Sequence, residues 1–259
     1  MTASLKSHSV GATMVLTISN PEHRNALGPE LYAAGVEALN VAESSADVRS
    51  VVIVGEGRHF CAGGNLQRLQ ANRQQPIEVQ AQSVGGLHNW IETIHTFPKP
   101  VIAAVEGACA GAGFSLALAC DFIVAARDAV FVMAYSNIGI SPDGGGSWAL
   151  TRSLPRATVM QLLMAGERIT PERLQQLGVV GTLTDGGAAL GEALALAEKL
   201  NARAPNALAS IKELVNDAAT NPLHTHLAAE LDHFVRNVHH ANGGEGIAAF
   251  LEKRTPQYR

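Results

Sequence analysis

The chain has 259 residues, of which 47% are hydrophobic and 16% are charged, and this composition excludes a disordered protein. Its 19 basic and 23 acidic side chains give a net charge of −4, so we expect no general attraction to nucleic acid or to an anionic membrane. The three cysteines lack CxxC spacing, which is typical of reduced thiols in the cytoplasm, and the N-terminus shows no apolar segment of a secretory signal.

Two strand patterns and one helix pattern open the chain. Residues 14–19 and 48–54 are rich in β-branched and apolar side chains and are bounded by turn residues, which predicts strands. Between them, Gly28 and Pro29 begin a stretch with apolar residues at roughly helical spacing, which predicts a helix. The first unit is therefore expected to be strand, helix, strand.

The same alternation continues in the most apolar part of the chain. Residues 101–105 predict a buried strand, and a Gly-rich turn, a helix that begins near Gly111 and a strand at 121–125 follow it. Acidic residues at positions 106 and 121 interrupt this region, so no part of it is long enough to span a bilayer. The pattern predicts an α/β fold around a largely buried sheet.

Helical patterns predominate after residue 151, where residues 179–183 form the one good strand candidate. No low-complexity linker or internal repeat divides the chain. We therefore expect a single domain over residues 1–259, in which a core of residues 1–200 is followed by a helical region at 201–259. The predicted C-terminal helices are residues 171–177, 188–202, 206–216, 224–240 and 244–254.

Two Gly-rich turns, at residues 57–66 and 106–113, follow predicted strands. Small residues let the backbone approach a ligand closely, and N–H groups at a helix N-terminus point toward negative charge. Two such turns together are able to form an oxyanion hole. Each turn taken alone is also consistent with close packing of the turn on its own helix.

Two further motifs in this region are incomplete. Gly111 and Gly113 begin a dinucleotide-binding GxGxxG pattern, but Leu116 takes the place of the third glycine. Residues 113–117 match half of a GxSxG nucleophile elbow around Ser115 and lack its final glycine. We interpret Ser115 as a buried or capping residue, and we keep as an alternative a serine hydrolase in which its hydroxyl is the nucleophile.

A third turn places Asp143 before three glycines and a predicted helix. One interpretation is that its carboxylate caps the helix by accepting a hydrogen bond from the backbone of Gly145 or Gly146. Successive glycines weaken the start of a helix, which is easier to understand if a substrate must approach the backbone there. A carboxylate beside such a surface is a candidate general base.

Five of the ten histidines lie in residues 224–240, with His226, Glu230 and His233 on adjacent helical turns. This arrangement is consistent with metal ligands, but the polar faces of amphipathic helices look the same. No third His or Cys ligand is found at a defined spacing, so we expect no metal.

Taken together, these stretches resemble the enoyl-CoA hydratase/isomerase family, also called the crotonase family. The matching segments occur in the order of the family and cover nearly the whole chain. No single segment decides the resemblance, and their ordered set carries it. The segments are residues 21–27, 60–66, 99–121, 138–140 with 142–145, and 245–254.

The resemblance implies a spiral of ββα units with a helical C-terminal trimerisation region, assembled as a homotrimer or a dimer of trimers. It also implies an acyl-CoA thioester as the substrate. Coenzyme A is then carried as part of the substrate, and no separate cofactor is implied. No nucleic-acid or membrane partner is implied either, and the expected location is cytoplasmic.

The resemblance also implies which backbone groups hold the substrate. By position, the N–H groups of Gly64 and Ala112 hold the thioester carbonyl and stabilise the enolate that forms when a proton leaves the adjacent carbon. Ala112 replaces the usual glycine of this position, so its methyl group is expected to narrow the pocket. Lys253 matches a basic position that approaches the phosphates of CoA. The full set of implied substrate contacts is Arg24, Ala26, Leu27, Ala62, Gly63, Asn65, Leu66, Gly111, Tyr135, Phe250 and Lys253.

Departures from the family pattern indicate the reaction. Family hydratases add water with two glutamates, whose positions are occupied here by Ser115 and Tyr135, and neither side chain replaces a carboxylate. Asp143 falls where some family isomerases, including those acting on ring-opened phenylacetyl-CoA intermediates, place their acidic base. The resemblance therefore implies a 1,3-proton shift, in which Asp143 removes a proton from the acyl chain and returns it to another carbon.

Two other activities and one noncatalytic role stay open. A hydratase would use Asp143 or a water molecule held by Tyr135. A chlorobenzoyl-CoA dehalogenase would use Asp143 as a nucleophile with His88 as its partner, although such dehalogenases have a Trp at the position of Tyr135. A noncatalytic acyl-CoA-binding protein is suggested by the absence of both hydratase glutamates.

Overall fold

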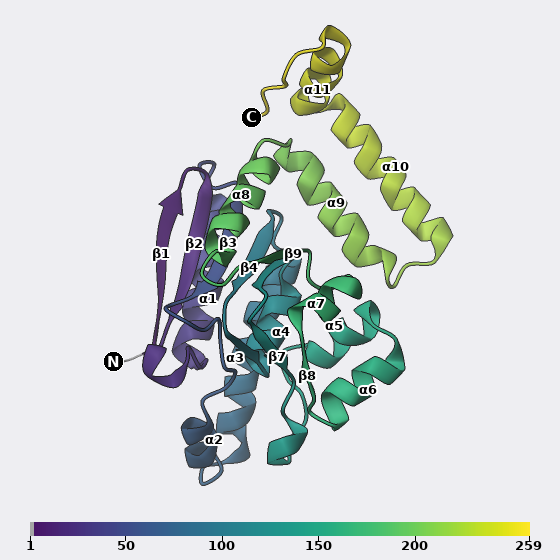
Figure 1. Cartoon of the computed structure of the whole chain (residues 1–259). Coiled ribbons are helices and arrows are strands. Elements are labelled where there is room, and N and C mark those ends of the chain that lie inside the picture. Colours follow the sequence, from purple (N-terminus) through teal and green to yellow (C-terminus); the bar gives the residue numbers. More distant parts are fainter. Residues whose placement is uncertain (1–2) are drawn as a thin grey trace.

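The centre of the molecule is a six-stranded sheet, seen in a computed structural model that describes residues 3–259 (Figure 1). Its first two strands form an antiparallel hairpin, and each later strand runs parallel to its neighbour. Parallel neighbours need crossover connections, and each of those in this sheet contains at least one helix. In sheet order the strands are β1 (Ser4–Val10), β2 (Thr13–Ser19), β3 (Ser50–Gly55), β4 (Val101–Val105), β6 (Phe122–Ala126) and β9 (Thr182–Thr184).

A smaller three-stranded sheet and the helices surround this sheet. The smaller sheet consists of β5 (Ala108–Ala110), β7 (Val130–Val132) and β8 (Arg168–Ile169). The helices are α1 (Pro29–Ser44), α2 (Leu66–Asn72), α3 (Ile77–Thr96), α4 (Ala112–Ala119), α5 (Gly146–Ser153), α6 (Arg156–Met164), α7 (Pro171–Gln176), α8 (Ala189–Asn201), α9 (Pro205–Ala218), α10 (Leu223–His239) and α11 (Ala241–Glu252).

Both faces of the main sheet are buried, and β3 shows how its sequence achieves this. Successive side chains of a strand point to opposite faces. Val51 and Ile53 belong to the main hydrophobic cluster, which also includes residues of α1, α3 and α4, whereas Val52 and Val54 pack in the cluster formed with α8. A sheet covered on both faces needs continuous apolar strands, and the run SVVIVG of β3 supplies one.

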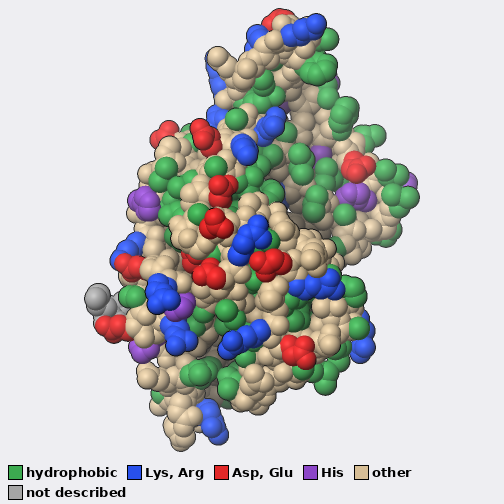
Figure 2. All heavy atoms as spheres, viewed as in Figure 1, with side chains coloured by type: hydrophobic (Ala, Val, Ile, Leu, Met, Phe, Trp, Pro, Cys, Tyr) green, Lys and Arg blue, Asp and Glu red, His purple; other side chains and the backbone are tan. Residues whose placement is uncertain are grey.

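Helices α9 to α11 form an arm that extends away from the sheet (Figure 1). Many apolar side chains of this arm are exposed, and Figure 2 shows hydrophobic groups along it. Monomeric proteins seldom expose apolar patches of this kind, which mark interaction surfaces. Within residues 3–259, every helix is too short or too polar to cross a membrane.

The predicted secondary structure is confirmed in most places. Strands at 14–19, 48–54, 101–105 and 121–125 correspond to β2, β3, β4 and β6, and all five predicted C-terminal helices form within two to three residues of their expected ends. The strand expected at 179–183 is wrong in position, because β9 begins only at Thr182. Val179 and Val180 instead donate backbone hydrogen bonds to Leu174 and close the end of α7.

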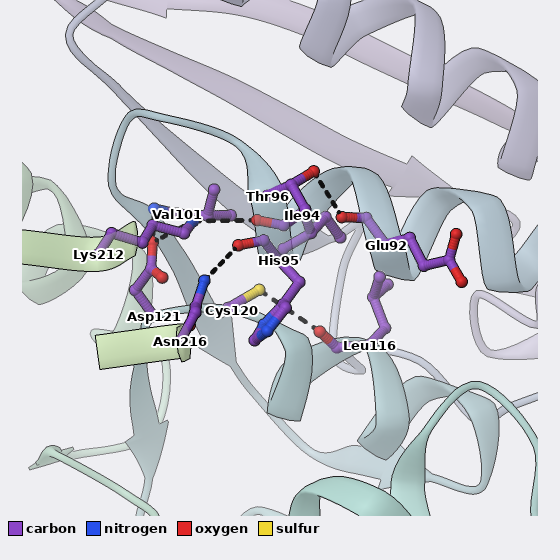
Figure 3. A network of polar contacts seen from close by, with 10 residues as sticks. All are labelled: Glu92, Ile94, His95, Thr96, Val101, Leu116, Cys120, Asp121, Lys212 and Asn216. Carbon is purple, nitrogen blue, oxygen red and sulfur yellow. Dashed lines mark hydrogen bonds and ion pairs between the residues drawn. The ribbon is translucent and has the colours of Figure 1, made fainter. Parts of the chain in front are cut away.

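The arm is fastened to the core by α9. Lys212 donates to Asp121 Oδ2 at 2.9 Å and to the carbonyl of Ile94 at 3.0 Å, and Asn216 donates to the carbonyl of His95 at 2.9 Å (Figure 3). The last carbonyls of a helix have no partner inside it. Two polar side chains of α9 therefore complete the C-terminal end of α3, and Asp121 in turn accepts the N–H of Val101 at 2.8 Å.

Replacing Lys212 by Met is expected to destabilise the protein. The Lys212 and Asp121 side chains are only 11% and 21% exposed, so the substitution leaves a carboxylate largely shielded from water without its cation. We expect a loss of roughly 2 kcal/mol in the free energy of unfolding, measured by urea denaturation. Lys199→Met on the exposed side of α8 is the control and should change it by less than about 0.5 kcal/mol. Equal effects of the two substitutions would contradict the role given to Lys212.

Candidate active site

Hydrogen bonds join the first two Gly-rich turns side by side. The N–H of Cys61 donates to the carbonyl of Ala108 at 2.9 Å, and the N–H of Ala110 donates back to the carbonyl of Cys61 at 2.9 Å. Cys61 and Cys109 form a parallel bridge. The segment after β3 thus continues as a strand-like partner of β5. The second turn leads into α4, and residues 61–63 of the first turn pass beside the N-terminus of α4 before the chain enters α2.

The contact between the two turns requires a glycine in α4. A Cβ atom at Gly113 would lie 2.4 Å from the carbonyl oxygen of Cys61, which is closer than real Cβ contacts allow. A Cβ at Gly63 would lie 3.5 Å from the backbone N of Ala112. The residue before Gly64 is therefore next to Ala112, as the oxyanion-hole prediction requires.

The N–H groups of Gly64 and Ala112 are available to donate hydrogen bonds to a ligand. Ala112 is the first residue of α4, so no carbonyl of its own helix can accept its hydrogen. No backbone hydrogen bond described for residues 3–259 has Gly64 as its donor, and the space beside its Cα is open. The methyl group of Ala112 belongs to the main hydrophobic cluster and is buried.

The third turn brings Asp143 to the same place, but not as a helix cap. The N-cap of α5 is Gly145, which has φ of +74° and no side-chain cap, and the N–H of Gly146 binds the main-chain carbonyl of Asp143 at 3.2 Å. The interpretation of the Asp143 carboxylate as an N-cap is therefore wrong. Gly144 and Gly145 both have φ values in the left-handed region. The chain therefore turns so that the Asp143 carboxylate faces away from the N-terminus of α5.

The carboxylate of Asp143 faces Tyr135. The Tyr135 hydroxyl donates to Asp143 Oδ1 at 2.6 Å, and the Ser115 hydroxyl donates to the Asp143 main-chain carbonyl at 3.0 Å. Burial raises the pKa of Tyr135, and the charge of Asp143 raises it further, so the phenol stays protonated and acts as a donor. A Cβ at Gly111 would lie 3.6 Å from the Tyr135 ring, which places the pair beside the turn that precedes Ala112.

A second phenol, which the sequence did not indicate, lies near this carboxylate. Tyr32 comes from α1 and is buried, and its pKa is raised by burial and, to a smaller extent, by the charge of Asp143. No hydrogen bond joins Tyr32 to Asp143 in the described part of the chain. Its position in α1 is typical of a core residue, so no sequence signal could have distinguished it.

Ser115 does not have the role that its half-matched motif suggested. Ser115 is 1% exposed, and its hydroxyl donates to carbonyl oxygens of Gly111 and Asp143. A buried hydroxyl engaged in this way is not an activated nucleophile, which removes the support for a serine hydrolase. His88 lies on α3 and lines a cavity together with Ser115 and Gly144.

The turn at residues 24–27 packs against the first Gly-rich turn. The N–H of Leu27 donates to Gly63 at 2.8 Å, and the N–H of Ala62 donates to Arg24 at 3.0 Å. Arg24 and Asn25 both have positive φ, and the buried Asn25 side chain donates to the carbonyls of Glu56 and His59. Backbone strain held by a buried amide is common at binding sites.

Most predicted substrate contacts are gathered around these two turns. Asn65 accepts the N–H of Arg68 at 3.1 Å and caps α2, and the next residue, Leu66, is largely exposed. Arg24 and Arg58 bring positive charge to this edge, and burial, followed by these charges, lowers the pKa of His59. The predicted residues that these contacts bring together are Arg24, Ala26, Leu27, Ala62, Gly63, Gly64, Asn65, Leu66, Gly111, Ala112, Tyr135 and Asp143.

Phe250 and Lys253 are not brought to this site within one chain. The segment after α11 is held at the start of β3, where Arg49 donates to the carbonyl of Tyr258 at 2.8 Å. The first Gly-rich turn follows the other end of β3. Phe250 is 84% exposed.

The histidines of α10 form no cluster that could hold a metal. His226 lies 3.6 Å from Glu230, and His233 lies 3.7 Å from Glu213 on α9. Among residues 3–259 there is no group of three His, Cys, Asp or Glu side chains arranged to hold an ion.

The geometry agrees with comparisons to known proteins. The sequence profile of the enoyl-CoA hydratase/isomerase family matches residues 9–259. The chain belongs to this family. A crystal structure of an enoyl-CoA hydratase from Polaromonas sp. JS666 superposes with a TM-score of 0.98 and 70% sequence identity, over 98% of this chain and 99% of the other. This match confirms the crotonase fold.

Two curated relatives differ in activity. The chain is 37% identical to the 1,2-epoxyphenylacetyl-CoA isomerase of Escherichia coli K12, over 97% of both chains. It is 33% identical to the 2,3-dehydroadipyl-CoA hydratase of the same organism, over 95% of this chain and 94% of the relative. The protein is therefore an enzyme of a family that acts on acyl-CoA thioesters, and its relatives include both isomerases and hydratases.

Tyr135→Phe is expected to lower turnover of acyl-CoA substrates by about 10- to 100-fold. The substitution removes one hydrogen bond to a charged group, which is worth about 1.5 to 3 kcal/mol, and keeps the ring. Steady-state kinetics should show the loss mainly in kcat, because the hydroxyl holds Asp143. Tyr32→Phe is the matched control, since this second phenol makes no hydrogen bond to the carboxylate, and we expect a change below about threefold. A larger loss in Tyr32→Phe would contradict the assignment.

Proposed function

We propose that the protein is an enoyl-CoA isomerase, which shifts a double bond by a 1,3-proton transfer. The observation that carries the proposal is the position of Asp143, whose carboxylate is held by Tyr135 beside the turn leading to Ala112. The two positions that carry glutamates in hydratases of the family are Ser115 and Tyr135 here. Asp143 is thus the carboxylate available for proton transfer.

In this reaction Asp143 removes a proton from the carbon next to the thioester of a 3-enoyl-CoA. The electrons of the broken C–H bond delocalise over the double bond and the thioester carbonyl, which becomes an enolate oxygen. The N–H groups of Gly64 and Ala112 donate to this oxygen, and one such donor is worth about 3 kcal/mol. Asp143 then returns the proton to the carbon at position 4, which yields a 2-enoyl-CoA without water or a separate cofactor.

Tyr135 orients the base in this mechanism. Its hydroxyl occupies Oδ1 of Asp143, which leaves Oδ2 free for the proton. Because the phenol remains protonated, it supports the carboxylate through both transfers. Arg24, Ala26 and Leu27 would line the CoA moiety, with residues 62–66 and Gly111 completing the wall.

The assembly that we propose is a homotrimer or a dimer of trimers, and the exposed apolar side chains of the arm support association with other copies. Phe250 and Lys253 lie at the opposite end of β3 from the oxyanion turn of their own chain. In the proposed assembly they would reach the CoA site of a neighbouring copy, where Lys253 would meet the phosphates.

A hydratase is the second candidate. The 2,3-dehydroadipyl-CoA hydratase relative favours it, and the Tyr135 hydroxyl and Asp143 are the groups that would hold a water molecule. A dehalogenase has less support, since Tyr135 rather than a Trp lies beside Asp143. A noncatalytic role also has less support, because it does not account for the hydrogen bond that orients the Asp143 carboxylate.

Asp143→Asn is expected to lower the rate of isomerisation of a 3-enoyl-CoA by about 1,000-fold or more, because the amide cannot accept the proton. A 3-enoyl-CoA and a 2-enoyl-CoA are offered in parallel, and isomerisation and hydration are followed by absorbance and product chromatography. CoA-ester binding by calorimetry should persist in the variant. Unchanged isomerisation in Asp143→Asn would sink the proposal, and hydration without isomerisation in the natural protein would favour the hydratase.

Phe250→Asp is expected to convert an assembly of three or six 27.1 kDa chains into smaller species. A charge on a covered apolar surface costs several kcal/mol, whereas the same charge on an open surface costs little. Analytical ultracentrifugation measures the mass. Ile77→Asp is the control, because Ile77 is 81% exposed outside the arm, close to the 84% of Phe250. A single-chain mass for the natural protein would contradict the proposed assembly.

A further inference from the structure

A cavity of about 770 Å³ lies between α3, α4, α5 and α9, and no step of the proposed reaction uses it. Its volume is within the range of small-molecule pockets. Figure 3 shows the part where His95 of α3 and Lys212 and Asn216 of α9 come together, next to the C-terminal end of α4. The arm therefore forms one wall, and the core forms the others.

The cavity begins where the proposed chemistry takes place. Ser115 and Gly144 line it, and both are adjacent to Asp143: the first donates to its carbonyl, and the second follows it in the chain. Ser115 and Ala119 follow Ala112 by three and seven residues, so all three lie on one face of α4. At 1.5 Å per residue, the cavity extends along α4 from roughly 4 Å to roughly 10 Å behind Ala112.

The charged groups around the cavity are balanced. Lys212 is paired with Asp121 at 2.9 Å, and the remaining charges are one acidic side chain, Glu92, and one basic side chain, Arg152. Burial, followed by the charge of Lys212, lowers the pKa of His95, so its ring is neutral at pH 7. A charged ligand group entering the cavity would find no unpaired buried partner, which makes its desolvation costly.

Apolar side chains from four helices, α3, α4, α5 and α9, form most of the remaining wall. They are Ile91, Leu118, Trp148, Leu208, Ile211 and Val215.

Trp148 is fixed as part of this wall. The His95 ring meets the indole edge-on at 5.4 Å between centroids, and the guanidinium of Arg152 stacks over the indole at 3.9 Å. An aromatic ring held between two partners loses little further freedom when a ligand packs against it.

We propose that this cavity selects a neutral, extended apolar acyl group, and that Trp148 and the α9 wall determine this preference. The inference rests on the proposed function, since it assigns the acyl part of the thioester substrate. Apolar contacts remote from the reacting carbons then supply binding energy along the chain.

Saturated acyl-CoA thioesters test the subsite, because they lack the double bond that would be shifted. Dissociation constants are measured by calorimetry for butanoyl-CoA, decanoyl-CoA and the CoA monothioester of decanedioic acid. We expect decanoyl-CoA to bind at least ten times more tightly than butanoyl-CoA, because six more methylene groups are buried. The monothioester, with a carboxylate at its far end, should bind at least ten times more weakly than decanoyl-CoA.

Two variants assign this preference to the cavity. Trp148→Ala, and independently Ile211→Glu on α9, should each reduce the preference for decanoyl-CoA over butanoyl-CoA at least fivefold. Both side chains are about half exposed, at 46% and 56%, so folding should tolerate the changes. Val41→Ala is the matched control, because Val41 is 57% exposed and lines a different groove, between α1 and α3. It should leave the preference within twofold.

Three outcomes would each overturn the proposed selectivity of the cavity. They are equal affinities for the short and long thioesters, tightest binding of the carboxylate-terminated thioester, and an unchanged preference in both variants. These outcomes are separate from failure of the proposed reaction. Loss of isomerisation with the binding preference intact rejects the isomerase alone, whereas no binding of any acyl-CoA rejects both proposals.

Discussion

The contact between Cys61 and residues 108–110 is the constraint on which the site depends. Two segments that follow different strands of the main sheet are joined there by paired backbone hydrogen bonds. Only because Gly113 lacks a side chain can the carbonyl of Cys61 approach α4 so closely. Gly64 and the first N–H of α4 are thereby placed next to one another by main-chain geometry. Donors held in this way need no rearrangement when negative charge develops on a bound oxygen.

Asp143 reaches this pair through a second close approach. A Cβ at Gly146 would lie 2.6 Å from the Ser115 hydroxyl, so the third turn packs directly on α4. A glutamate at position 115 would compete with the turn for this space. The small hydroxyl of Ser115 instead donates to the main chain of the turn, and the carboxylate that a hydratase would carry on α4 is replaced by one on the turn.

The sequence predicted the architecture better than it predicted the contacts of the site. Apolar strands such as β3 and β4 are recognisable because both faces of the sheet are buried, whereas β1 was missed because its side chains are mostly exposed and polar. The resemblance placed Gly64, Ala112 and Asp143 together, since these positions follow the family's order. It did not place the Asp143 carboxylate on Tyr135, because that contact depends on two successive left-handed glycines that a sequence pattern does not distinguish from a helix cap.

Helix α9 links the arm to the interior of the core. Its Lys212 and Asn216 satisfy the last carbonyls of α3, and its apolar side chains face the same cavity as Trp148. The hydrogen bonds that fix the arm and the apolar contacts that would meet an acyl group are thus made by one helix. If the exposed side chains of α10 and α11 are covered by neighbouring copies, assembly constrains α9 through its short connections. The shape of the cavity then depends on the same contacts that hold the copies together.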